Sequence, residues 1–253
     1  MSLLEELVAG IGGGGVEVVD LTSPLRSDTP ILHLPEPFGN TWPFSLEEIS
    51  RYDDRGPAWY WNNIRTGEHT GTHFDAPVHW VTGKSGDDVS QVPPTRLVAP
   101  AVVLDFSARV GHDPDFLLGV DDVAGWVDEH GPLPDGGWLL YRTGWDSREG
   151  DAANNEGHSP GISADCARWL AEETPVLGLG VETVGTDAGA AHGFDPPFPC
   201  HTYLLGAGKY GLTQLRNVGL LPARGAVLLA APLPIVGGSG SPCRVLALVE
   251  RER

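Results

Sequence analysis

The segment HTGTHFDAPVH, residues 69–79, carries three histidines and an aspartate within eleven positions. Imidazole and carboxylate groups are common ligands of catalytic divalent metals, and two histidines with one carboxylate leave coordination positions open for water and substrate. His69, His73 and Asp75 could form such a set, and His79 remains as a group that can carry a proton. The alternative is a structural or non-catalytic site, because a single histidine in an enzyme is more often a hydrogen-bonded structural residue than a ligand.

Alternation along this segment predicts a strand and not a helix. The odd positions hold the histidines, the aspartate, Gly71 and Pro77, whereas the even positions are β-forming and mostly apolar. Successive strand residues point to opposite faces, so the chemical side chains would share one face. Residues four apart in a straight strand are about 13 Å apart, but ligands of one zinc-like ion lie about 2 Å from it. A bend at Gly71 is therefore expected to bring His69 and His73 together.

Short apolar runs elsewhere predict the strands that would support this segment, and helical patterns fall between them. The expected strands are 16–21, 101–106, 138–142, 176–181, 226–231 and 245–250, and the expected helices are 2–11, 121–130 and 163–173. Ser163 is placed to cap the last helix. We expect one α/β domain over residues 1–253, with a mixed central sheet and flanking helices. Residues 22–63 are rich in proline and aromatics and are expected to form a long loop or lid over the site.

Composition excludes several classes of protein. The formal net charge is -18, from 16 basic and 34 acidic residues, so the chain should repel nucleic acid and anionic membrane surfaces. No apolar stretch approaches the roughly 20 residues that span a bilayer. Three widely spaced cysteines favour neither a disulfide framework nor a structural zinc site. The sequence predicts a cytoplasmic protein that acts on a small molecule.

The histidine segment also resembles a known family. It matches the signature H-x-G-T-H-x-D-x-P-x-H of the cyclase-like metal-dependent hydrolases, the family of bacterial kynurenine formamidase and isatin hydrolase. The resemblance continues in the family's order through VVDLTSPL, YRTGW, PGISADCARWLAE, GLGVET, FPCHTYLLGAGKYG and PLPIVGGSGSPCRVLAL. It implies the swivelling β/β/α type of fold and a homodimer or homotetramer. The long aromatic segment within residues 36–63 is more similar to the isatin hydrolases than to the formamidases.

The resemblance also implies roles for individual residues. The family positions that match His69, His73 and Asp75 hold a divalent ion, and the position that matches His79 acts in proton transfer. The implied cofactor is one divalent metal ion, either manganese or zinc, because imidazole and carboxylate suit both.

A second ion is less expected. Some members of the family hold one with a histidine that matches His201 and a glutamate about twelve residues further on, where this chain has Thr213 and Gln214. A hydroxyl or an amide lacks the charged oxygen that a hard cation prefers. Glu182 stands in an altered family segment and is a candidate to replace the glutamate. For His201, a buried histidine that is hydrogen-bonded beside the site is an equally acceptable interpretation.

Candidate substrate-binding residues are less specific. Arg142 could orient a carboxylate or a carbonyl, although an arginine at a strand end is more often solvated or ion-paired. Large aromatic residues could line a pocket for a flat substrate, although such residues are more often part of the core. The aromatic candidates are Trp80, Phe74, Trp59 and Trp61.

These observations give one leading hypothesis and two alternatives. The leading hypothesis is metal-dependent hydrolysis of an amide, lactam or related acyl C–N bond in a small aromatic molecule, by metal-bound hydroxide with His79 as the proton shuttle. The first alternative is a polyketide-type cyclase in which the same metal stabilises an enolate. The second is a protein that binds a metal or a small molecule without catalysis.

Overall fold

The computed structural model describes residues 1–148 and 157–251 of the chain. Its α-helices are α1 (Leu3–Gly12), α2 (Ser107–His112), α3 (Val120–His130) and α4 (Ala164–Glu172). Its strands are β1 (Val16–Asp20), β2 (Ser45–Asp53), β3 (Gly56–Arg65), β4 (His73–Asp75), β5 (Val98–Asp105), β6 (Leu117–Leu118), β7 (Trp138–Arg142), β8 (Gly161–Ile162), β9 (Gly178–Val181), β10 (Tyr210–Thr213), β11 (Ala226–Pro232) and β12 (Gly240–Glu250).

The main sheet closes on itself as a barrel. Its order is β1-β12-β11-β5-β7-β9-β10-β4, and β4 also pairs with β12. The pairs β5–β7, β7–β9 and β9–β10 are parallel, whereas β4, β11 and β12 pair antiparallel with their neighbours. The predicted mixed sheet is therefore confirmed, and its closure depends on the three-residue strand β4.

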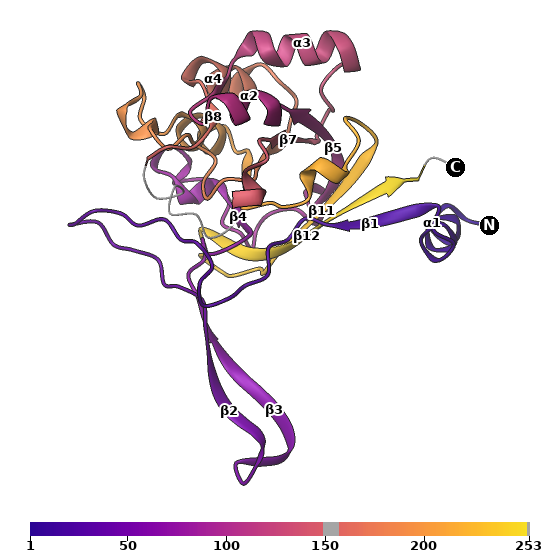
Figure 1. Ribbon diagram of the computed structural model, residues 1–253, viewed down its shortest axis with the longest axis vertical. Helices are drawn as coiled ribbons and strands as arrows, with labels where there is room; N and C mark the ends of the chain where they lie inside the picture. Colours follow the sequence, from indigo (N-terminus) through magenta and orange to yellow (C-terminus); the bar gives the residue numbers. More distant parts are fainter. Residues whose placement is uncertain (149–156, 252–253) are drawn as a thin grey trace.

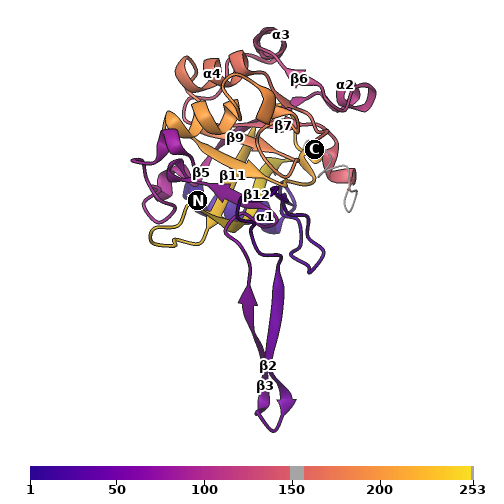
Figure 2. The same ribbon diagram turned by 90° about the vertical axis from the view of Figure 1, so that its left-hand side faces the viewer.

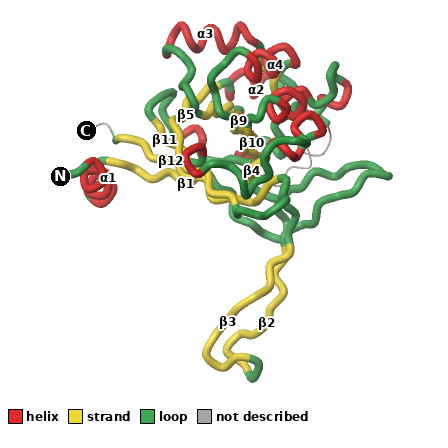
Figure 3. The backbone as a smooth tube through the Cα atoms, turned by 180° about the vertical axis from the view of Figure 1, so that it is seen from behind, coloured by secondary structure: helices red, strands yellow, loops and turns green. Residues whose placement is uncertain are grey.

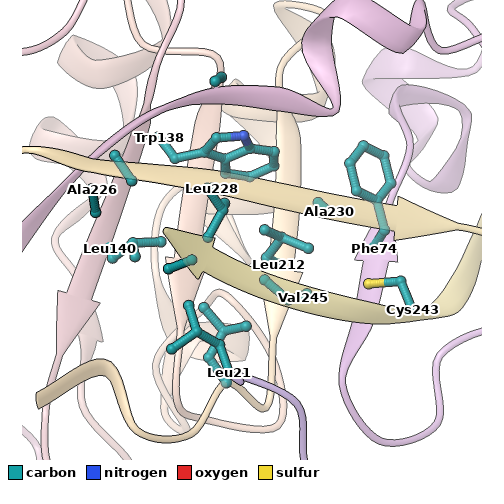
Figure 4. Packing of buried hydrophobic residues seen from close by; sticks show 14 of the residues in the cluster. Leu21, Phe74, Trp138, Leu140, Leu212, Ala226, Leu228, Ala230, Cys243 and Val245 are labelled. Carbon is teal, nitrogen blue, oxygen red and sulfur yellow. The ribbon is translucent and has the colours of Figure 1, made fainter. Parts of the chain in front are cut away.

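The barrel interior and the helix layer form two apolar clusters. Figure 4 shows the interior, where Trp138, Leu228 and Val245 pack together from β7, β11 and β12. A second cluster lies between the sheet and helices α2, α3 and α4, which gather on one side of the barrel in Figures 1 and 2. The parallel strands are buried from both sides, as their continuous apolar sequences predict.

Helix α4 shows how local sequence positions the helix layer. Ser163 caps it by accepting a hydrogen bond from the backbone N–H of Cys166, as expected from the sequence. The side chains of Cys166, Ala167 and Leu170 are buried on the face that packs against the sheet. Helix α1, in contrast, has no buried residue and begins with a capping box between Ser2 and Glu5.

The expected loop over residues 22–63 was wrong for its second half. Strands β2 and β3 form an antiparallel hairpin that projects from the barrel in Figures 1 and 3. Most of its residues are exposed on both faces, so its sequence has no buried face and lacks the alternation that identifies a half-buried strand. Trp59 and Trp61 are 50% and 54% exposed on this hairpin.

Over the residues described, none of the helices combines the length and the apolar character needed to cross a bilayer.

Candidate metal centre

Strand β4 presents His73 and Asp75 on one face at the position where the barrel closes. Asp75 pairs with Gly211 of β10 on one side and with Gly240 of β12 on the other. A Cβ at Gly211 would lie 2.7 Å from Asp75 Oδ2, and a Cβ at Gly240 would lie 2.4 Å from the carbonyl oxygen of Phe74. Both neighbours of Asp75 must therefore be glycine for the strands to pair around its carboxylate.

The bend predicted at Gly71 is present and brings His69 back towards β4. Gly71 has φ of +70°, in the left-handed region, and a Cβ there would lie 2.5 Å from Leu25 Cδ2. The ring centroids of His69 and His73 are 5.1 Å apart, far closer than a straight strand allows. The sequence prediction that these two imidazoles converge is confirmed.

Asp75 is the centre of the arrangement. Its Oδ1 lies 2.8 Å from His69 Nδ1 and 3.3 Å from His73 Nε2. The Asp75 side chain is buried, which by itself would raise its pKa, but the facing imidazoles of His73 and His69 hold the pKa well below its usual range. The centre therefore contains a buried carboxylate with two imidazole nitrogens directed at one of its oxygens.

His79 joins this group from the following turn. A 3₁₀ turn over Pro77–His79 ends β4 and stacks the His79 ring on His69, with centroids 3.9 Å apart. Ligand-capable atoms of His69, Asp75 and His79 all lie within 4.8 Å of one another. Burial lowers the pKa of His79 to about 3, so the imidazole is neutral at physiological pH.

The contacts of His73 orient its ring. Its Nδ1 lies 2.7 Å from the carbonyl oxygen of Gly71, to which it can only donate a proton. Thr213 Oγ1 lies 2.9 Å from the same nitrogen and 3.1 Å from Nε2. In the neutral ring, Nε2 then carries the lone pair, and this atom faces Asp75. A ring held by a backbone carbonyl with its other nitrogen directed inward is typical of a metal-ligating histidine.

The donor set fits a divalent cation. Two imidazole nitrogens and one carboxylate oxygen converge in a buried position. The contacts of the Asp75 carboxylate given above are with histidines, and neither a lysine nor an arginine is among them. Ligand atoms that each lie about 2 Å from one ion are themselves about 3 Å apart. The present separations of 2.8 Å and 3.3 Å from Asp75 Oδ1 to the two imidazole nitrogens are therefore suitable for binding an ion.

His201 lies beside this group and has its own carboxylate partner. Its Nδ1 is 2.5 Å from Asp187 Oδ2, and Asp187 Oδ1 accepts a hydrogen bond from the backbone N–H of Cys200. Burial opposes protonation of His201, but the hydrogen bond and charge of Asp187 outweigh it and raise the His201 pKa. The His201 ring centroid is 5.5 Å from that of His79 and 4.8 Å from that of Trp80. Sequence reasoning did not find Asp187, because its distance along the chain from His201 matches no motif.

The position expected for a second-metal ligand carries no carboxylate. Thr213 contacts His73, and Gln214 turns its side-chain amide to the carbonyl oxygen of Pro30. Glu182 does not reach the centre either, because its Oε2 accepts hydrogen bonds from the backbone N–H groups of Thr143 and Trp145. Its candidacy as a replacement ligand is therefore corrected. Burial raises the pKa of Glu182 despite these bonds.

Most of the proposed substrate-binding residues lie elsewhere. Arg142 forms an ion pair with Asp105 in a groove beside α3, as its alternative interpretation predicted. Phe74 is completely buried in the barrel, because the alternation of β4 directs it away from the histidines (Figure 4). Trp59 and Trp61 lie on the projecting hairpin.

Trp80 is the aromatic candidate that the structure brings to the centre. It is half-buried, and its ring lies 6.2 Å from His79 and 5.6 Å from Phe198, centroid to centroid. Its Nε1 donates a hydrogen bond to Thr202 Oγ1 at 3.2 Å, which fixes the indole beside His201.

The chain is similar to known proteins in both sequence and structure. The family model described as "Putative cyclase" matches residues 19–188. The chain is 46% identical to the isatin hydrolase of Roseibium aggregatum, with 99% of this chain and 98% of that protein covered. It is 30% identical to a kynurenine formamidase of Salinibacter ruber, with 73% and 77% covered. The structure of isatin hydrolase A from Ralstonia solanacearum superposes with a TM-score of 0.95 at 52% identity, with 99% of this chain and 98% of that chain covered.

Proposed function

The chain belongs to the cyclase family and is a metal-dependent amidohydrolase, and we propose that its substrate is isatin, whose lactam C–N bond it hydrolyses. Water adds across that bond: its oxygen bonds to the carbonyl carbon, the C–N bond breaks, and a proton passes to the nitrogen. The observation that carries this proposal is the buried Asp75 carboxylate, on which His69 and His73 converge beside the neutral imidazole of His79.

We assign one manganese or zinc ion to His69, His73 and Asp75. When bound, such an ion polarises the scissile carbonyl and makes a water molecule more acidic. The ring orientation of His73 favours this set, whereas the tight grouping of His69, Asp75 and His79 favours a set in which His79 replaces His73. The occupants of the second position, Thr213 and Gln214, favour a single ion.

His79 is assigned the proton transfer. Its imidazole is neutral at physiological pH, so a lone pair is present to accept the proton of the attacking water. Burial makes this imidazole a weaker base than a free histidine, and the charge of the nearby Asp75 acts in the opposite direction. Asp187 raises the pKa of the neighbouring His201 and so favours its protonated form. A positive charge on His201 would stabilise the product carboxylate that forms when the lactam ring opens.

Trp80 supports a flat aromatic substrate. Its indole is fixed by Thr202 and lies beside both His79 and His201, so it offers a rigid face on which a fused ring can stack. We expect Trp80→Ala to raise KM for isatin more than it lowers kcat.

Isatin turnover in water enriched in ¹⁸O tests the reaction, and metal analysis of the His73→Ala and His79→Ala variants tests the ligands. We expect one label in the product carboxylate, about one equivalent of metal in the wild-type protein, no metal in His73→Ala, and retained metal in His79→Ala. An unlabelled, cyclised product from an open-chain substrate would favour the cyclase alternative. If His79→Ala loses the metal and His73→Ala keeps it, His79 would be the ligand and His73 would be the residue for proton transfer.

We also propose that the protein forms a homodimer or homotetramer in which the hairpin β2–β3 contacts a second copy. A two-stranded ribbon is marginally stable by itself in water, yet this one exposes Leu46 and the cross-strand neighbour Ile64. An apolar groove at its base is lined by residues that include Phe44, Leu233 and Ile235. Light scattering should give a lower molecular mass for the double variant Leu46→Glu/Ile64→Glu than for the wild-type oligomer. The control Leu3→Glu, which changes an exposed apolar residue on α1, should keep the wild-type mass. A wild-type mass in the double variant would contradict this interface.

We further propose a cytoplasmic location. Cys166, Cys200 and Cys243 are all free and buried, as expected for a chain that folds under reducing conditions. Fractionation of the cells that produce the protein would test it.

A further inference from the structure

We propose that Ser239 and Glu68 position His69 for metal binding by holding its ring in one tautomer. The inference rests on the proposed metal site and concerns two residues on its outer side. Ser239 belongs to the turn before β12, and Glu68 directly precedes His69 in the chain.

A continuous line of contacts joins Glu68 to Asp75. Ser239 Oγ donates to Glu68 Oε2 at 2.6 Å, and it lies 2.8 Å from His69 Nε2. The other ring nitrogen, Nδ1, lies 2.8 Å from Asp75 Oδ1. The ring of His69 is therefore held at both nitrogens, between a hydroxyl on its outer side and the central carboxylate on its inner side.

The backbone places the hydroxyl accurately. The N–H of Ser239 donates to Glu68 Oε2 at 3.1 Å, and its carbonyl oxygen accepts from the N–H of Ala76 at 2.9 Å. A Cβ at Gly238 would lie 3.0 Å from Glu68 Oε1, and a Cβ at Gly240 would lie 2.7 Å from His69 Cε1. The glycines on either side thus allow Ser239 to approach the histidine, and the turn is fixed to the end of β4.

Counting protons along this line gives the tautomer. A serine hydroxyl has one proton, and a carboxylate can only accept, so the proton of Ser239 goes to Glu68. Ser239 Oγ can then only accept from His69, which places a proton on Nε2. In the neutral ring, the lone pair is then on Nδ1. Asp75 Oδ1, 2.8 Å away, is also an acceptor, so without an ion this contact needs a proton on Nδ1, whereas a bound ion would take the place of that proton and join the two atoms as its ligands.

The order Ser239, His69, Asp75 is also that of a serine-hydrolase triad. In such a triad the histidine accepts the serine proton, whereas here Glu68 holds that proton away from His69. The contact with Glu68 therefore favours a positioning residue over a nucleophile, and the two roles predict different kinetics.

Mn²⁺ titration of the full-length protein, followed by the electron paramagnetic resonance of free Mn²⁺, tests the inference. We expect Ser239→Ala to weaken Mn²⁺ binding about 10- to 100-fold, with kcat restored at saturating Mn²⁺. Glu68→Gln should weaken binding in the same direction, and the double variant should lose little more than Ser239→Ala, because both residues act through one chain of hydrogen bonds. Ser241→Ala is the matched control, since its hydroxyl contacts Leu233 and Pro242 instead of His69.

Three results would overturn the inference, and they can be told apart. Wild-type affinity in both Ser239→Ala and Glu68→Gln would remove the positioning role alone. Turnover that stays lost in Ser239→Ala at saturating Mn²⁺ would assign Ser239 to the chemistry. A wild-type protein that binds no metal would overturn the proposed centre together with this inference. If Ser239→Ala does not fold, Glu68→Gln at its half-buried position gives the same comparison.

Discussion

Replacing Phe74 by alanine separates its two possible roles, core residue and substrate contact. The side chain is completely buried, with its ring centroid 5.1 Å from that of Tyr210 and 6.1 Å from that of Trp138. Truncation of such a phenylalanine leaves a cavity and costs about 3–5 kcal/mol of the free energy of unfolding. A domain of this size loses about 2–4 °C of Tm per kcal/mol, so Tm should fall by about 6–20 °C.

Urea unfolding of the metal-free protein, followed by tryptophan fluorescence, measures this cost without a contribution from bound metal. Phe38→Ala is the matched control, because Phe38 is 62% exposed and the change should stay within about 0.5 kcal/mol. A loss below about 1 kcal/mol for Phe74→Ala, combined with a raised KM, would refute the core assignment, since that cost is too small for a cavity of this kind.

Three further predictions concern the centre itself. Mn²⁺ at a hundred times its Kd should stabilise the wild-type protein by about 2.7 kcal/mol, and this thermal shift should vanish in Asp75→Ala; an equal shift in both would place the ion elsewhere. His79→Ala should keep the thermal shift but lose about 10²- to 10⁴-fold in kcat, and unchanged turnover in a steady-state assay would remove its proton-transfer role. Because Asp187 raises the pKa of His201, their pairing stabilises the fold fully below the ordinary histidine pKa of about 6.5 and is lost as the pH rises through the higher folded value. Asp187→Asn should thus cost more stability below that pH than well above it, and equal costs in urea unfolding at both pH values would contradict the pairing.

The sequence predicts those parts of the molecule in which local pattern and burial agree. The shared face of His73 and Asp75 and the bend at Gly71 follow from alternation and from one glycine, and both are present. The predicted strand is shorter than residues 69–79, because a 3₁₀ turn follows β4 and brings His79 to the group. Alternation also places Phe74 on the apolar face, so its burial could have been predicted from the same pattern that identified His73 and Asp75. Reading it as a pocket residue gave residue type more weight than position.

Other features depend on contacts between distant parts of the chain. Strand β4 lies within the segment that alternation predicts as a strand, but no local pattern predicts its partners, which are more than a hundred residues away. Glu182 and Gln214 are polar residues in family segments, and only the fold shows that they turn to backbone groups instead of the centre. The glycines on both sides of Ser239 indicate that the backbone there approaches another group closely. They do not predict that this group is the side chain of His69.

The closure of the barrel through β4 has a consequence for the protein outside its active state. Each strand within the closed ring has a partner on both sides, whereas β1 lies outside the ring and pairs with β12. An opened ring would expose two further edges, which can pair with other molecules. Here the strand that completes the ring, His73–Asp75, lies between β10 and β12 and also supplies two of the groups assigned to the ion. An ion bound there would stabilise β4 between its two neighbours and so keep the barrel closed. The same residues would then reduce intermolecular strand pairing and aggregation.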